Sequence, residues 1–167
     1  MIVKETEKME EIAVRGVTCN KSEAKVTICS VPDKPGIAGK IFGEISRQGI
    51  NVDTIVQNVP HDKLSDISFT VPKADLNRAL KTTTAIGEKI GAGEVFEDRN
   101  IARVSLVGSG MRSHSGIAAK MFKTLADHSI NIEMISTSEI SVSCIIQQDL
   151  ADKAVKALHK AFKLEQI

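Results

Sequence analysis

The 167-residue sequence predicts an α+β protein made of two copies of a βαββαβ unit. In each half of the chain, runs that alternate apolar and polar residues, typical of half-buried strands, are interrupted by stretches with helical apolar spacing. The second half also repeats the first: Gly36-Ile37 aligns with Gly116-Ile117, 80 residues later. The predicted order of strands and helices, β-α-β-β-α-β, is the split βαβ arrangement. We therefore expect antiparallel sheets with helices on one face.

The first half of the chain is taken in order. Residues 1–9 are charged and weakly patterned, and we interpret them as a linker or tail. Short alternating runs predict strands at 12–17 and 25–31. The following helix has one apolar stripe and ends near Gly49; the stripe consists of Ile37, Ala38, Ile41, Phe42 and Ile45. The later elements are strands at 50–58, 66–71 and 94–97 and a helix at 76–90.

The second half repeats these elements but lacks a final strand. Its strands are predicted at 103–107, 130–137 and 140–146, and its last helix at 149–162, with Asp149 as the N-cap. The N-terminal strand is surplus to the first unit, and a sheet edge without a partner is unfavourable. We expect that strand to complete the second sheet. The first domain, 24–98, is then inserted into the second, 10–19 plus 101–163.

The composition argues against several classes of binding partner. The chain has 22 basic and 21 acidic residues, which suggests neither a polyanion nor an anionic membrane surface. Aromatic residues are 3%, without Trp or Tyr, so the stacking platforms of single-strand nucleic-acid binders are missing. No apolar run reaches transmembrane length. We expect a cytoplasmic protein, with Cys19, Cys29 and Cys144 as small core residues in a reducing compartment.

No catalytic constellation and no metal site is recognisable. The run Gly108-Ser109-Gly110 lacks the Gly-Lys-Ser/Thr ending of a phosphate loop. The four histidines have no Cys or carboxylate at metal-ligand spacing. No base is identifiable near the serines of the second turn. These observations favour a binding function over a catalytic one.

The turn at 33–38 is the main candidate for a binding site. Backbone N–H groups at a helix N-terminus without a bulky side chain can bind a carboxylate. Asp33 is a candidate for an ammonium group, and Gln57 and Asn58 offer uncharged polar contacts at the end of a strand. The alternative is that Pro35 and Gly36 only set the backbone geometry of the connection between the strand and the helix. A second copy of the turn, in the matching position, shifts the balance towards a site.

Three motifs resemble the regulatory region of aspartate kinases. They are residues 31–36 (VPDKPG), residues 50–59 (INVD followed by VQNV) and residues 135–140 (ISTSEI). That region is a tandem pair of ferredoxin-like ACT domains, and the resemblance covers residues 10–162. It implies feedback inhibition by lysine, threonine or both. The regulated reaction is the ATP-dependent phosphorylation of aspartate, the first step towards lysine, threonine and methionine.

The resemblance also implies particular effector-binding residues, at interfaces between ACT units. The first site would consist of Asp33, Gly36, Ile37, Ala38, Gln57, Asn58, Asn131 and Ile132. A possible second site would consist of Ser113, His114, Ser115, Gly116, Thr137, Ser138 and Glu139. Many relatives have proline where Ser115 stands, so the first turn is expected to be the better site.

The implied partners are a second copy of the chain, paired through ACT domains, and a kinase domain or catalytic subunit. ATP and magnesium belong to that kinase domain, which this chain lacks, so we expect no cofactor, metal or catalytic residue here. The alternative is a purely structural dimerisation module with empty turns. Whether the chain is a natural small subunit or an excised fragment stays open, as does the choice between lysine and threonine.

Overall fold

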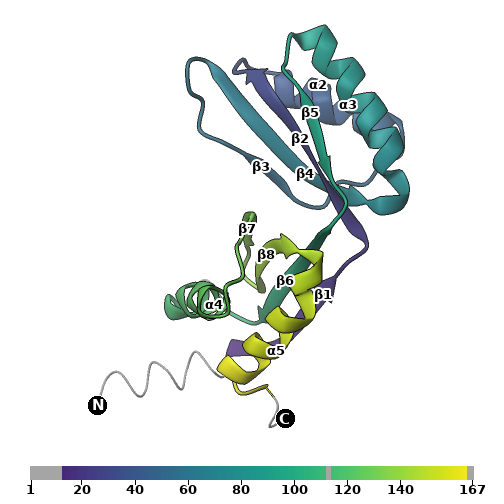
Figure 1. The fold of residues 1–167 in the computed structure, drawn as a ribbon. Helices are drawn as coiled ribbons and strands as arrows, with labels where there is room; N and C mark the ends of the chain where they lie inside the picture. Colours follow the sequence, from purple (N-terminus) through teal and green to yellow (C-terminus); the bar gives the residue numbers. More distant parts are fainter. Residues whose placement is uncertain (1–12, 112–113, 165–167) are drawn as a thin grey trace. The chain divides into compact units, whose positions relative to one another are not determined.

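The computed structural model describes residues 13–111 and 114–164 (Figure 1). The chain divides into two compact units. The central unit is Ser22–Arg99, and the split unit combines the described residues before Ser22 with those after Arg99. The predicted tail at 1–9, and residues 10–12 of the predicted second domain, lie outside the described residues. The predicted domain boundaries therefore stay a prediction.

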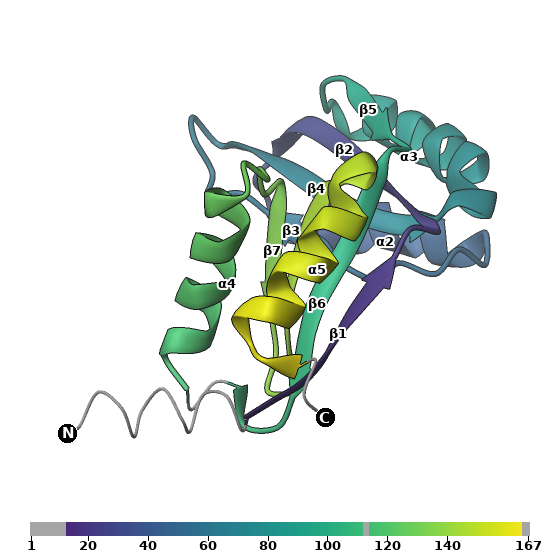
Figure 2. The same ribbon diagram turned by 60° about the horizontal axis from the view of Figure 1, so that its bottom comes forward.

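The split unit is a four-stranded antiparallel sheet in the order β1-β6-β8-β7. Helices α4 and α5 lie side by side on one face of this sheet (Figure 2). Its elements are β1 (Val14–Asn20), β6 (Ile101–Gly108), α4 (Gly116–Asp127), β7 (Met134–Thr137), β8 (Ser141–Gln147), the 3-10 turn η3 (Gln148–Leu150) and α5 (Ala151–Ala161).

The central unit is built in the same way, with the sheet order β3-β4-β2-β5 and helices α2 and α3. Its elements are β2 (Glu23–Pro32), α2 (Ile37–Arg47), β3 (Ile55–Gln57), β4 (Leu64–Pro72), the 3-10 turn η1 (Lys73–Asp75), α3 (Leu76–Ile90) and β5 (Val95–Asp98). The predicted α+β class and the repeated unit are confirmed.

Within the described residues no strand follows α5, and β1 takes the edge position beside β6. It pairs antiparallel with β6, with Thr18 opposite Ser105. In the central unit the equivalent place, beside the strand that precedes the first helix, is taken by β5, which pairs with β2. The expectation that the N-terminal strand completes the second sheet is confirmed.

Three strands differ from their predicted bounds by three or more residues at one end. β1 extends beyond its predicted end at residue 17 to Asn20, because an edge strand pairs through its backbone and tolerates polar side chains. β3 and β7 start later than predicted. The backbone N–H of Ile50 closes α2 by bonding to Ile45 O at 3.3 Å, and that of Ile130 closes α4 at Leu125 O, at 2.9 Å. Residues 50 and 130 are therefore still bonded to the ends of their helices, and the strands begin only at Ile55 and Met134.

Two further expectations are wrong. Asp149 does not cap α5, because the turn η3 takes up residues 148–150 and no side chain caps the helix that follows. Cys19 is exposed, since β1 has a neighbouring strand on one side only, and Cys29 is half-buried. Only Cys144 is a buried cysteine in the described part of the chain.

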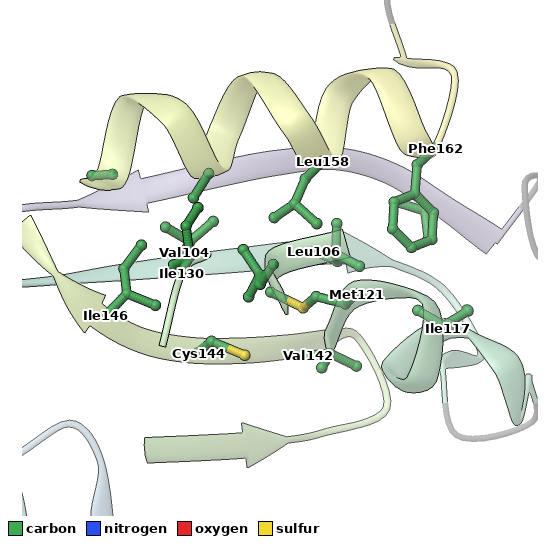
Figure 3. Close-up of a cluster of buried hydrophobic side chains, with 14 of the residues drawn as sticks. Val104, Leu106, Ile117, Met121, Ile130, Val142, Cys144, Ile146, Leu158 and Phe162 are labelled. Carbon is green, nitrogen blue, oxygen red and sulfur yellow. The ribbon is translucent and has the colours of Figure 1, made fainter. Parts of the chain in front are cut away.

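Each unit has its own hydrophobic core between sheet and helices. In the split unit, Val104 and Leu106 of β6 and Ile146 of β8 lie on the side of the sheet that faces α5, in one core with Leu158 and Phe162 (Figure 3). Alternate strand positions thus face one side, as the sequence pattern predicts. Among the described residues, no helix is long and apolar enough to cross a bilayer.

Candidate functional site

The first turn ends in a left-handed glycine at the start of α2. Gly36 has φ +90° and ψ −10°, a conformation that glycine adopts without the steric cost of a Cβ. No side chain caps α2, and its first turn contains no acidic residue. Ala38, in the first turn of the helix, is exposed. The N-terminal N–H groups and the helix dipole therefore form a favourable place for an anion.

The β3–β4 hairpin holds this turn in place. The backbone N–H of Asp33 donates to Lys63 O at 2.9 Å, and Ile37 N–H donates to Lys34 O at 3.3 Å. The Asp33 side chain is exposed and, within the described residues, makes no hydrogen bond or ion pair. Its carboxylate is thus available to a cationic group.

Gln57 and Asn58 lie at the end of β3, on the same hairpin. Gln57 Nε2 donates to Ser65 Oγ at 3.1 Å, and the backbone N–H of Asn58 donates to Asp66 O at 3.0 Å. Ser65 stands opposite Val31 in the β2–β4 pairing, two residues before Asp33. The structure thus brings the exposed amide of Gln57 near the start of the first turn.

Asn131 and Ile132 belong to the split unit. They lie between α4 and β7, where Asn131 is exposed and Ile132 is half-buried against the core of that unit. Their role beside the first turn stays a prediction.

The second turn is held mainly by its own loop. His114 Nδ1 lies 2.8 Å from Gly110 O, a geometry that fits a hydrogen bond donated by Nδ1–H. Ile117 N–H donates to His114 O, and Gly116 is the first residue of α4, after the exposed Ser115. Ser113 lies outside the described residues.

The β7–β8 turn lies against this loop, because Met111 N–H donates to Glu139 O at 2.8 Å. Ser138 Oγ accepts hydrogen bonds from the N–H groups of Ile140 and Ser141, at 3.3 and 3.1 Å. The hydroxyl of Ser138 therefore stabilises its own turn, while the side chains of Thr137 and Glu139 are exposed. Each unit thus places a helix-opening turn beside the hairpin of its sheet.

The described residues contain no group of three or more His, Cys, Asp or Glu side chains placed to hold a metal ion. Burial raises the pKa of the Cys144 thiol to about 12, so this residue is a poor nucleophile. What the first turn offers is instead a combination of backbone donors, a free carboxylate and an amide.

Sequence reasoning missed Lys63 and Ser65, which hold the turn and Gln57. Ser65 is only 4% exposed, at a strand position whose neighbours on the same face are apolar. A polar residue at such a position was the available signal for a side-chain hydrogen bond. Lys63 acts through its backbone carbonyl, for which the sequence carries no signal.

Comparison with known proteins gives the family. Models of the ACT domain match residues 25–90 and 104–162. Aspartate kinase Ask_LysC of Stutzerimonas stutzeri (strain A1501) is 52% identical over 161 residues, which are 96% of this chain and 39% of that protein. The chain therefore spans well under half the length of the curated relatives that it matches.

Two solved structures match over nearly their whole length. A chain of the aspartokinase alpha and beta subunit structure is 45% identical with a TM-score of 0.86, covering 91% of this chain and 100% of that one. The ligand-free regulatory subunit of aspartate kinase from Thermus thermophilus is 40% identical with a TM-score of 0.86, covering 90% and 99%. With two ACT domains and these relatives, the chain belongs to the family of aspartate kinase regulatory regions.

Proposed function

We propose that this chain binds a free amino acid and thereby mediates feedback inhibition of aspartate kinase by lysine, threonine or both. The observation that carries the proposal is the first turn. It combines the uncapped N-terminus of α2, the free carboxylate of Asp33 and the amide of Gln57. A free amino acid carries a carboxylate and an ammonium group, which are complementary to the first two.

The first turn is the stronger of the two candidate sites. Its glycine is left-handed, and the Asp33 carboxylate has no partner among the described residues. In the second turn, the Ser138 hydroxyl is already used by the β7–β8 turn, and His114 is engaged with Gly110. Of the second set of residues, Thr137 and Glu139 remain the best candidates for contacts to a ligand.

The regulated reaction is proposed from the family, since this chain corresponds to only 39% of the curated relative. In the assembled enzyme a kinase polypeptide would phosphorylate aspartate with ATP and magnesium. This chain would supply the effector site and change the activity of that partner.

We also propose that the chain pairs with a second copy through its sheet edges. β3 and β7 each form one of the two edges of their sheets, and apolar side chains are exposed on or beside them. They are Ile55, Val59 and Leu64 in the central unit and Ile135 and Ile140 in the split unit. Uncovered edges with apolar side chains favour association.

Thermal unfolding with lysine, threonine and both together tests the effector proposal. A ligand that binds only the native state adds about 2.7 kcal/mol at a hundredfold excess over its Kd. We expect a rise in melting temperature that saturates with concentration, and none with an amino acid such as glutamate. An unmoved melting temperature in a dimeric protein would instead support a purely structural dimerisation module.

A further inference from the structure

A groove between α2 and α3 of the central unit is not explained by effector binding at the turn. Two adjoining hollows of about 440 and 370 Å³, which share Glu44 and Ile86, make up this α2/α3 groove. Small or apolar residues form part of its lining, among them Gly39, Gly43 and Ala85. Its volume suits the side chains of a docked segment.

The glycines of this groove serve no packing contact inside the unit. A Cβ added at Gly39 or at Gly43 would meet no atom within 4 Å. Glycine inside a helix is less favourable than alanine. The two glycines thus weaken α2 without a gain in the described contacts, and they leave its backbone open to close approach.

The corresponding helix pair of the split unit differs in its residues. There, Ala119 and Lys123 replace Gly39 and Gly43, at the same spacing of 80 residues. Phe162 is 1% exposed at the end of α5 (Figure 3), and Lys120 Nζ of α4 lies 4.8 Å from the centre of its ring. In the central unit, α3 ends at Ile90 and is followed by Gly91.

The charges around the groove are mostly positive. Five basic side chains and one acidic side chain line it; these are Lys40, Arg47, Arg78, Lys81, Lys89 and Glu44. Glu44 already accepts a hydrogen bond from Arg47, and Arg78 is paired with Asp75. Within the described residues, the side chains of Lys40, Lys81 and Lys89 make neither an ion pair nor a hydrogen bond.

We propose that the α2/α3 groove docks an acidic amphipathic segment of the kinase polypeptide, an inference that rests on the proposed function. Apolar side chains of the segment pack on the glycines and on Ile86. Its carboxylates pair with the three free lysines, which steers association and excludes a second copy of this basic surface as the occupant.

The groove and the first turn are parts of the same helix. Gly36 is a predicted effector residue, and it also lines the groove. A ligand at the turn therefore acts on the helix that the partner contacts. The coupling is reciprocal. If the effector lowers the affinity of the chain for its partner, the partner lowers the affinity of the chain for the effector by the same factor.

Titration of the kinase polypeptide with this chain, by calorimetry at several salt concentrations, tests the proposal. The parent chain is expected to bind more weakly as ionic strength rises. The combined change Lys40→Glu, Lys81→Glu and Lys89→Glu is expected to raise Kd at least roughly tenfold. The matched control is Lys153→Glu with Lys160→Glu, on exposed positions of α5, which should leave Kd unchanged.

A second variant separates docking from folding. Gly43→Leu fills the groove and favours the helix, so we expect an unchanged or higher melting temperature together with a Kd raised at least about tenfold. Normal binding by both variants would overturn the docking site, as would failure of the parent chain to bind the kinase polypeptide. The shift of melting temperature with lysine or threonine, measured on the same proteins, reports independently whether the proposed effector site stands.

Discussion

Gln57 donates a hydrogen bond from Nε2 to the hydroxyl of Ser65, 3.1 Å away, and thereby holds its amide at the end of β3. Gln57 is exposed and Ser65 is buried, so the pair joins a surface group to a fixed support. The oxygen of the Gln57 amide and its second N–H remain available to a ligand.

Gln57→Ala is therefore expected to weaken effector binding without unfolding the protein. Loss of a neutral hydrogen bond costs about 0.5–1.5 kcal/mol, which corresponds to roughly a 2- to 13-fold rise in Kd. Calorimetry with lysine and threonine measures the change, and Gln48→Ala at the other end of α2 is the control. If Gln57→Ala lowers the melting temperature of the ligand-free protein strongly, the residue has a structural role instead.

Gly36→Ala and Gly39→Ala are expected to change stability in opposite directions. An added Cβ has free space at both positions, but only Gly36 has a positive φ, of +90°. Gly36→Ala should therefore destabilise by about 1–2 kcal/mol. Gly39→Ala, inside the helix, should stabilise by about 0.5–1 kcal/mol. Denaturant unfolding of both variants checks this pair, and equal effects would contradict the backbone argument.

Removal of residues 1–17 is expected to destabilise the split unit more than the central unit. β1 pairs with β6 through residues up to Asn20, so its loss leaves β6 at an open edge. Hydrogen exchange should show faster exchange in β6 and β8, with β2 and β4 as internal controls. Equal protection of all four strands in the shortened chain would mean that β1 contributes little to its sheet.

The sequence predicted what depends on local periodicity. The helix expected from Leu76 to Ile90 has those bounds in the structure, because its apolar spacing and the following glycine are both local signals. The extent of β3 was not predictable in this way. It depends on which N–H of the segment after α2 closes the helix, and apolar residues such as Ile50 fit either role.

The candidate site was predictable only in part. A turn with glycine before a helix is visible in the sequence, and so are polar residues at the end of a strand. The hydrogen bond from Asp33 N–H to Lys63 O joins residues 30 positions apart through backbone atoms, which no side-chain pattern encodes. The use of Ser138 by its own turn is a local serine motif, and it was missed because the family resemblance suggested a ligand.

The ion pair between Lys21, the residue after β1, and Asp152 of α5 contributes to the stability of the split unit in a pH-dependent way. The hydrogen bond from Lys21 lowers the pKa of Asp152 below its ordinary value of 3.8, and the same bond raises the pKa of Lys21 above 10.5. The Asp152 contribution is thus present above pH 3.8 and lost as the pH falls through the lower folded-state pKa. The Lys21 contribution is present below pH 10.5 and lost as the pH rises through the higher one.

Lys21→Met is expected to return the pKa of Asp152 towards its ordinary value. NMR titration of the carboxyl carbon measures this shift, and Lys153→Met is the control because Lys153 neighbours Asp152 in sequence but takes no part in the pair. Added salt should reduce the difference, since both side chains are exposed. An unchanged titration of Asp152 in Lys21→Met would show that the pair does not form in solution.

The three cysteines are expected to react with a thiol reagent in the order Cys19, Cys29, Cys144. The thiolate is the reactive form, and burial raises the pKa of the Cys144 thiol to about 12. Cys144 also lies inside the core of the split unit, so the reagent reaches it only when that core opens. Cys19 is exposed on the edge strand and should account for the fast phase at pH 8, which Cys19→Ser should remove. The slow phase, which is the labelling of Cys144, then measures how often the core of the split unit opens. It should quicken in the chain shortened by residues 1–17, because that chain lacks most of the strand next to β6. Labelling of Cys144 as fast as Cys19 in the native protein would contradict the burial on which this order depends.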